Sequence, residues 1–282
     1  MAWREIALLR TKKQNNIMAK GETYEEFVAK FKKNAPKTTD DCYTPQPVYE
    51  VVKEYALKLA GLTEETCTPV RPFYPGGDYR NYDYPADAYV IDNPPFSILS
   101  EIRRFYIEKG IKYFLFAPAL MCIRPIYDTI ICAYSDIIYS NGATVKTSFV
   151  TNAANREFCL MTAPALKKRL EEIFQHDKKI YGKETKKLKS YIHPKNTFTA
   201  RDIALTSRTD FFIRRTESRY VGKIGSHEQF GGAYLLSDRA AAELEKARAA
   251  AELEKARAAT AIQLKFSTEQ EEIVKQLNEK HK

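Results

Sequence analysis

The stretch that most constrains the fold of this chain is residues 88–96, where a short apolar run meets two successive prolines. Residues 88–91 are apolar and include a β-branched pair, which predicts a short buried strand. The prolines at 94 and 95 fix the backbone and lack N–H donors, so the strand has to end at Asn93. A turn at the carboxyl end of a strand in an open α/β sheet lies where such folds bind ligands. We therefore expect a functional site at this turn.

The side chains of the turn suit the recognition of one kind of group. Asn93 offers an amide oxygen as an acceptor, and the Pro94 carbonyl, on a stiffened backbone, can offer a second acceptor aimed at the same point. Phe96 offers a face for stacking. Two acceptors beside an aromatic plane suit a planar ring with an exocyclic amine, such as a flipped adenine or cytosine. The alternative is that these residues form only a proline turn that closes a strand.

The tetrapeptide Asn93-Pro94-Pro95-Phe96 resembles the catalytic motif of the S-adenosylmethionine-dependent amino-methyltransferases, most closely the adenine-N6 DNA methyltransferases. Tyr43, Thr44 and Pro45, ahead of a predicted helix, are similar to the cofactor motif of one subgroup of that family. The resemblance implies that S-adenosylmethionine is the cofactor and DNA the partner. It also implies that the tetrapeptide is catalytic and that positioning of the target amine dominates the catalysis.

The stretch 69–79 is expected to hold the first core strand and the loop beneath the cofactor. By resemblance, the further cofactor-binding residues are Pro72, Phe73, Gly76, Gly77, Asp78 and Asp92. The loop departs from the usual Asp-x-Gly-x-Gly pattern, and a plain turn is the alternative. From Phe73 to Asn93 is 20 positions, whereas a complete methyltransferase core fits two more strands and a helix there. The sheet is therefore expected to be shortened.

The remaining patterns predict an α/β fold, namely a Rossmann-like methyltransferase core with a shortened sheet, a basic C-terminal appendage and a helical tail. Helices are expected at 47–60, 97–110, 124–134 and 165–174, and strands at 111–118, 136–139, 144–151 and 157–162, the last two as a hairpin. The glycines between 222 and 232 predict a loop.

The net charge of +9 is unevenly distributed along the chain. Residues 40–165 carry 11 Lys and Arg against 15 Asp and Glu, whereas residues 166–220 carry 15 against 7. Lys and Arg can neutralise phosphates while aromatic residues stack on bases. The region 166–237 is therefore expected to recognise the nucleic-acid target, although a small packed appendage with a solvated surface is the alternative. The nucleic-acid-binding candidates are Lys187, Lys189, Arg214, Arg215 and Arg219.

Two further segments flank these regions, so that the expected divisions are 1–40, 41–165, 166–237 and 238–282. Residues 1–40 are a basic arm with a short helix. The tail contains a nine-residue repeat, 242–250 and 251–259, of strong helix-forming composition. Nine residues make two and a half turns, so Leu244 and Leu253 face opposite sides of a helix. We expect a solvated helical spacer.

Composition argues against several other classes of protein. No apolar run is long enough to span a membrane, and the first residues lack the layout of a signal peptide, so we expect a cytoplasmic protein. The five cysteines form no Cys-x-x-Cys pair and the four histidines are scattered, so neither a disulfide framework nor a metal site is expected.

These observations favour an enzyme that transfers a methyl group from S-adenosylmethionine to the N6 amine of adenine in DNA. Two alternatives stay open. One is a non-catalytic DNA-binding protein on a degenerate methyltransferase core. The other is an amino-methyltransferase that acts on RNA, a free nucleotide or a protein glutamine, because these groups also present N–H donors to two acceptors.

Overall fold

The computed structural model describes residues 43–73, 78–124, 128–175, 194–224 and 227–260. Predictions for Gly76, Gly77, Lys187, Lys189, the arm at 1–40 and the end of the tail lie outside the described residues. The helices are α3 (Gln46–Ala60), η1 (Phe96–Ile98), α4 (Leu99–Glu108), η2 (Ala119–Cys122), α5 (Pro164–Ile173), α7 (Ala200–Thr206), η3 (Arg215–Glu217) and α8 (Asp238–Thr260). The strands are β1 (Thr68–Val70), β2 (Ala88–Asp92), β3 (Lys112–Pro118), β4 (Thr129–Ile138), β5 (Thr144–Thr151), β6 (Phe158–Thr162), β7 (Thr197–Phe198), β8 (Phe212–Arg214), β9 (Ser218–Ile224) and β10 (His227–Leu236).

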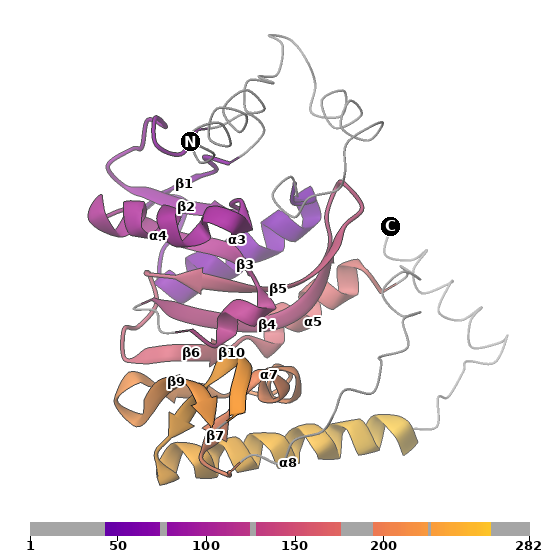
Figure 1. Ribbon diagram of the computed structural model, residues 1–282. Helices are drawn as coiled ribbons and strands as arrows, with labels where there is room; N and C mark the ends of the chain where they lie inside the picture. Colours follow the sequence, from indigo (N-terminus) through magenta and orange to yellow (C-terminus); the bar gives the residue numbers. More distant parts are fainter. Residues whose placement is uncertain (1–42, 74–77, 125–127, 176–193, 225–226, 261–282) are drawn as a thin grey trace, which may run out of the picture.

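A seven-stranded mixed sheet in the order β1-β2-β3-β5-β4-β6-β8 forms the centre of the molecule (Figure 1). The pairs β1/β2, β2/β3 and β4/β6 are parallel, and the remaining neighbours are antiparallel. The α/β class is confirmed, and the parallel β1-β2-β3 portion is compatible with a Rossmann-like fold. Because these three strands point the same way, their carboxyl ends share one edge of the sheet.

Helices cover both faces of this sheet. Helices α3 and α5 contribute to one apolar layer with side chains of β2, β3 and β4, and α4 contributes to the layer on the opposite face. Local sequence sets the ends of α3, since a proline occupies its first turn and Gly61 closes it in the left-handed conformation. The predicted helix at 47–60 is confirmed. The predicted strand at 111–118 and the helix before it are confirmed with small shifts of their ends.

The C-terminal part of the chain is packed against the large sheet. A second sheet, in the order β7-β10-β9, shares a buried layer with α7, α8, β4 and β6. Strand β8 belongs to the large sheet, where it pairs with β6. The large sheet therefore continues across the expected division at residue 165.

Two predictions for residues 124–162 are wrong. Where a helix was expected at 124–134, the chain forms strand β4, whose residues 129–133 are all buried. A continuous apolar run of this kind does not separate a buried strand from a helix by its period. Strand β5 pairs with β3 and β4 instead of forming a hairpin with β6, which pairs with β4 in parallel.

Two predictions for the C-terminal part are also wrong. The glycine-containing segment 222–232 lies largely in strands β9 and β10 and not in a loop. Gly232 has φ of 80°, and a Cβ atom there would come within 2.4 Å of the Tyr220 ring, so this glycine serves close packing at a bulge. Helix α8 is not a solvated spacer throughout, because Leu244 is fully buried while Leu253 is exposed.

Candidate functional site

The turn Asn93–Phe96 lies where the sequence predicts it, at the carboxyl end of the fully buried strand β2. Strand β2 is flanked by β1 and β3, both parallel to it. Pro94 is buried, Asn93 and Pro95 are half-buried, and Phe96 is half-buried against the apolar layer that contains α3. The turn is therefore held at the carboxyl edge, with three of its four residues only half-buried.

Asp92 joins this turn to the loop that follows β1. Its carboxylate accepts hydrogen bonds from the Phe73 amide at 2.6 Å and from the Asn93 amide at 2.9 Å. Its side chain is 2% exposed and lies 3.6 Å from the Arg71 guanidinium. Burial raises the pKa of Asp92, while Arg71 and the two amides oppose this shift. With both oxygens occupied by the protein, Asp92 fixes the relative position of two loops.

Arg71 extends this connection to helix α3. Its guanidinium lies 3.9 Å from the centre of the Tyr49 ring, a cation–π contact with the first turns of the helix. Burial raises the pKa of Tyr49 to about 12, so its phenol stays neutral at ordinary pH. The ends of β1 and β2 and the start of α3 thus form one braced unit.

Tyr43, Thr44 and Pro45 lie directly ahead of α3 in this unit. The Tyr43 carbonyl accepts a hydrogen bond of 3.0 Å from the Ser140 amide, at the turn between β4 and β5. The Pro45 carbonyl accepts from the Tyr49 amide and begins the helix. Thr44 is 5% exposed, and its hydroxyl makes no hydrogen bond within the described residues. A buried hydroxyl of this kind is suited to a bound group.

The other predicted cofactor residues divide into two groups. Pro72 is buried, and Phe73 is half-buried with its ring 5.4 Å from that of Tyr79. Asp78 is exposed and binds its own turn, accepting hydrogen bonds from the Arg80 amide and the Asn81 side chain. Phe73 therefore lies at the carboxyl edge beside the turn, whereas the Asp78 carboxylate is engaged locally.

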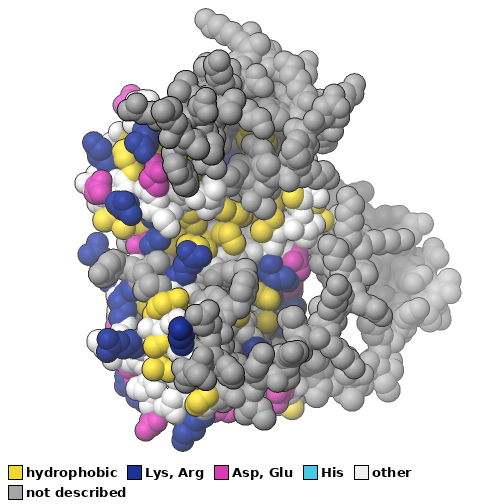
Figure 2. All heavy atoms as spheres, viewed as in Figure 1, with side chains coloured by type: hydrophobic (Ala, Val, Ile, Leu, Met, Phe, Trp, Pro, Cys, Tyr) yellow, Lys and Arg dark blue, Asp and Glu magenta, His cyan; other side chains and the backbone are white. Residues whose placement is uncertain are grey.

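The three described nucleic-acid candidates have different surroundings. Arg214 forms ion pairs with Glu157 at 2.6 Å and Glu217 at 3.4 Å. Arg215 donates to the backbone carbonyls of Arg156 and Asp128. Only Arg219 of the three has an exposed side chain. On the face drawn in Figure 2, Lys and Arg side chains are scattered among acidic and hydrophobic ones and form no single stripe over the described residues.

The sequence did not identify the residues that hold the site together through contacts between elements distant in the chain. Arg71 lies inside the stretch assigned to the cofactor loop, but its contacts with Tyr49 and Asp92 come from elements that are far apart in sequence. The sequence also contains no sign of a cavity that Tyr134 and Lys167 help to line. No local pattern marks that cavity, because it depends on an irregularity in β4.

Comparisons with protein-family models, curated protein sequences and solved structures give no match to this chain. The described helices include none with the length and apolar character needed to cross a membrane. Within the same residues, no group of three or more His, Cys, Asp or Glu side chains is arranged to hold a metal ion.

Proposed function

We propose that this protein is a methyltransferase that transfers a methyl group from S-adenosylmethionine to the N6 amine of adenine in DNA. The observation that carries the proposal is the link between Phe73 and Asn93 through the Asp92 carboxylate. It brings the loop that resembles a cofactor loop beside the turn that resembles a catalytic motif, at the carboxyl ends of adjacent parallel strands. This edge is the general ligand-binding position of open α/β sheets.

The residues at this edge fit the cofactor in their chemistry. The buried Thr44 hydroxyl lacks a partner within the described residues and would hold a polar group, while the Phe73 ring offers an apolar surface. Tyr43 and Pro45 set the position of Thr44 by anchoring the chain to the β4–β5 turn and to α3. S-adenosylmethionine, when bound, supplies the methyl group.

The turn itself would hold the target amine. The Asn93 side-chain oxygen and the Pro94 carbonyl would accept hydrogen bonds from the two N–H groups of the amine. This would direct the nitrogen lone pair away from the two oxygens and towards the methyl group. Phe96 would contact the base ring. The carbon–nitrogen bond would form as the methyl–sulfur bond breaks, S-adenosylhomocysteine would leave, and the extra amine proton would be lost to solvent afterwards, so the transfer needs no general base. Well-oriented reactants can account for about 7–11 kcal/mol of a barrier.

A non-catalytic nucleic-acid-binding protein is the second candidate. Strand β1 is the outermost described strand of the sheet, and the described residues between β1 and β2 contain no further strand. The sheet is thus short on the side where the family resemblance implies two more strands. An amino-methyltransferase that acts on RNA or protein glutamine would use the same turn and is the third candidate.

The test is incubation of the purified protein with methyl-labelled S-adenosylmethionine and separate DNA, RNA and protein substrates. Nucleoside and amino-acid analysis would identify the labelled product, and calorimetry would measure cofactor binding. We expect N6-methyladenine from DNA and saturable binding of the cofactor. DNA binding without any cofactor binding would instead establish the non-catalytic candidate.

A further inference from the structure

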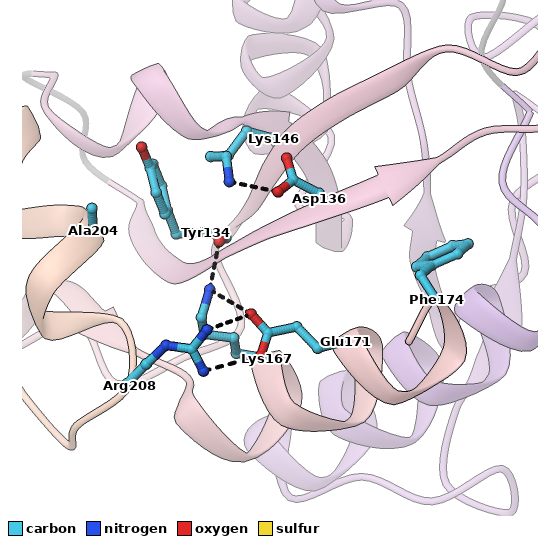
Figure 3. Close-up of a pocket in the computed structure, with 8 residues that line it drawn as sticks. All are labelled: Tyr134, Asp136, Lys146, Lys167, Glu171, Phe174, Ala204 and Arg208. Carbon is cyan, nitrogen blue, oxygen red and sulfur yellow. Dashed lines mark hydrogen bonds and ion pairs between the residues drawn. The ribbon is translucent and has the colours of Figure 1, made fainter. Parts of the chain in front are cut away.

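A cavity of about 330 Å³ lies beyond the carboxyl end of β6, and the Asn93 turn does not contribute to its lining. It is lined by Tyr134, Asp136, Lys146, Lys167, Glu171 and Arg208, among others (Figure 3). Strand β6 ends at Thr162 and is followed at once by α5, which forms one wall, while Arg208 follows α7 on the other side. A crevice between two helices outside the end of a strand is a general ligand position in α/β folds.

The backbone at this cavity is irregular in a specific way. Between Ile131 and Ser135, strand β4 contains more residues than its partner β5. Tyr134, in this bulge, has φ of 49° and is the one non-glycine with positive φ in the described part of the chain. Such a conformation is costly for an aromatic residue and tends to occur at ligand sites. The bulge places the Tyr134 ring at the cavity.

Lys167 and Ser148 hold Tyr134 in this conformation. The Lys167 ammonium donates to the Tyr134 carbonyl at 2.7 Å and to the Ala133 carbonyl at 3.3 Å, and it lies 3.3 Å from Glu171. The Tyr134 amide donates to the Ser148 hydroxyl at 3.1 Å. Lys167 is buried, and these three acceptors match its three N–H donors. Its role is therefore to shape the cavity.

Two other cations keep donors for a ligand. Lys146 pairs with Asp136 at 2.7 Å, which uses one of its three N–H groups. Arg208 binds Glu171 through both terminal nitrogens, at 3.0 and 3.1 Å, and this leaves three of its five donors. The Tyr134 hydroxyl makes no hydrogen bond to the described residues. Figure 3 shows Lys146 and Asp136 on one side of the cavity and Arg208 and Glu171 on the other, while the Tyr134 hydroxyl points away from Arg208.

We propose that this cavity binds one phosphate group through Lys146 and Arg208, which both line it. The three cations outnumber the two carboxylates, and the carboxylates hold the Lys146 and Arg208 head groups in place ahead of binding. Arginine suits phosphate because its planar donors match phosphate oxygens in pairs. The proposal does not depend on methyl transfer.

The phosphate has two sources that share this chemistry, a free phosphate group and the backbone of a nucleic acid. The experiment uses inorganic phosphate, followed by calorimetry, and a duplex oligonucleotide, followed by the dependence of its affinity on salt. The full-length protein is compared with the double variant K146A/R208A and the control Lys168→Ala.

We expect the double variant to weaken phosphate binding at least tenfold, to lower the salt slope for DNA by up to about two contacts, or both. Lys168 is exposed on α5 and does not line the cavity, so Lys168→Ala should leave phosphate binding unchanged and lower the salt slope by at most about one contact. An effect on phosphate alone assigns a free ligand, and an effect on DNA alone assigns the backbone. Wild-type protein that fails to bind phosphate, with an unchanged salt slope in folded variants, would overturn the proposal.

Discussion

The Asp92 carboxylate accepts a hydrogen bond from the Phe73 amide across 2.6 Å, although the residues lie 19 positions apart in the chain. The bond joins the end of β2 to the loop after β1, and Arg71 adds a cation beside the same carboxylate. Because the carboxylate is buried, its loss leaves both the amide and the guanidinium without this partner. The brace is thus a structural requirement for the site whatever the site binds.

Replacement of Asp92 tests this requirement directly. Asp92→Ala should lower the free energy of unfolding by about 3–5 kcal/mol, the usual range when one partner of a buried ion pair is removed. Asp92→Asn, which keeps one acceptor, should lower it less. Denaturant titration followed by circular dichroism measures both. Asp83→Ala is the control, since Asp83 is exposed, and a loss of equal size there would contradict the assignment.

The segment from β2 to β3 was predictable because its signals are local. Two prolines end β2, a glycine follows α4, and a continuous apolar run forms β3. Strand β4 was not predictable in this way, because its buried residues 129–133 have no period that separates strand from helix, and the bulge at Tyr134 has no sequence mark. The same limit applies to the strand pairing, which depends on contacts distant in sequence.

The sequence identifies both the Asn93 turn and the Tyr43–Pro45 segment as candidates. The fold joins both to the braced unit formed by the ends of β1 and β2 and the start of α3. The residues that hold these two segments in place were not identified from the sequence. Arg71 contacts Tyr49 and Asp92 from different elements, so its role appears only once β1, β2 and α3 are packed together. The nucleic-acid candidates were selected by residue type alone. Residue type does not distinguish Arg215, which binds backbone carbonyls, from Arg219, which is exposed.

Arg215 and Arg219 should therefore behave differently on substitution. Arg215→Ala removes donors to the Arg156 and Asp128 carbonyls and should lower the free energy of unfolding by about 1–3 kcal/mol. Arg219→Ala should change stability by no more than about 0.5 kcal/mol but lower the salt slope of DNA binding by about one contact. Thermal melts and filter binding at several salt concentrations measure the two effects. An unchanged slope would exclude Arg219 from the DNA surface.

The buried ammonium of Lys167 predicts a pH dependence of stability. Burial lowers the pKa of Lys167 from its ordinary value of 10.5. Between the lowered value and 10.5, the unfolded chain binds more protons than the folded one, so the contribution of Lys167 to the free energy of unfolding rises with pH. The free energy of unfolding of the wild type minus that of Lys167→Met should therefore rise with pH across that window, by at most about 1.4 kcal/mol per pH unit. A difference that falls with rising pH would contradict this assignment.

Helix α8 offers an internal comparison, because Leu244 and Leu253 occupy equivalent positions of the nine-residue repeat. Leu244 is 0% exposed and Leu253 is 53% exposed. Leu244→Ala should cost about 2–5 kcal/mol, the range for core leucines, while Leu253→Ala should cost about 0.5 kcal/mol or less. Equal costs in denaturant titrations would mean that residues outside the described part of the chain cover Leu253.

Two substitutions in the turn test the chemistry proposed for it. Asn93→Ala removes an acceptor that is needed mainly in the transition state, so kcat and kcat/KM should fall together while cofactor and DNA affinity stay near wild type. Phe96→Ala removes a contact made already in the bound complex, and it should also weaken retention of the flipped base by about 1–3 kcal/mol. Because Phe96 packs partly against the layer containing α3, its variant needs a thermal melt beside the kinetics. Ser100→Ala, on the exposed face of α4, is the control for both. A folded Asn93→Ala protein with the wild-type kcat would end the methyltransferase assignment and leave the tetrapeptide as a proline turn.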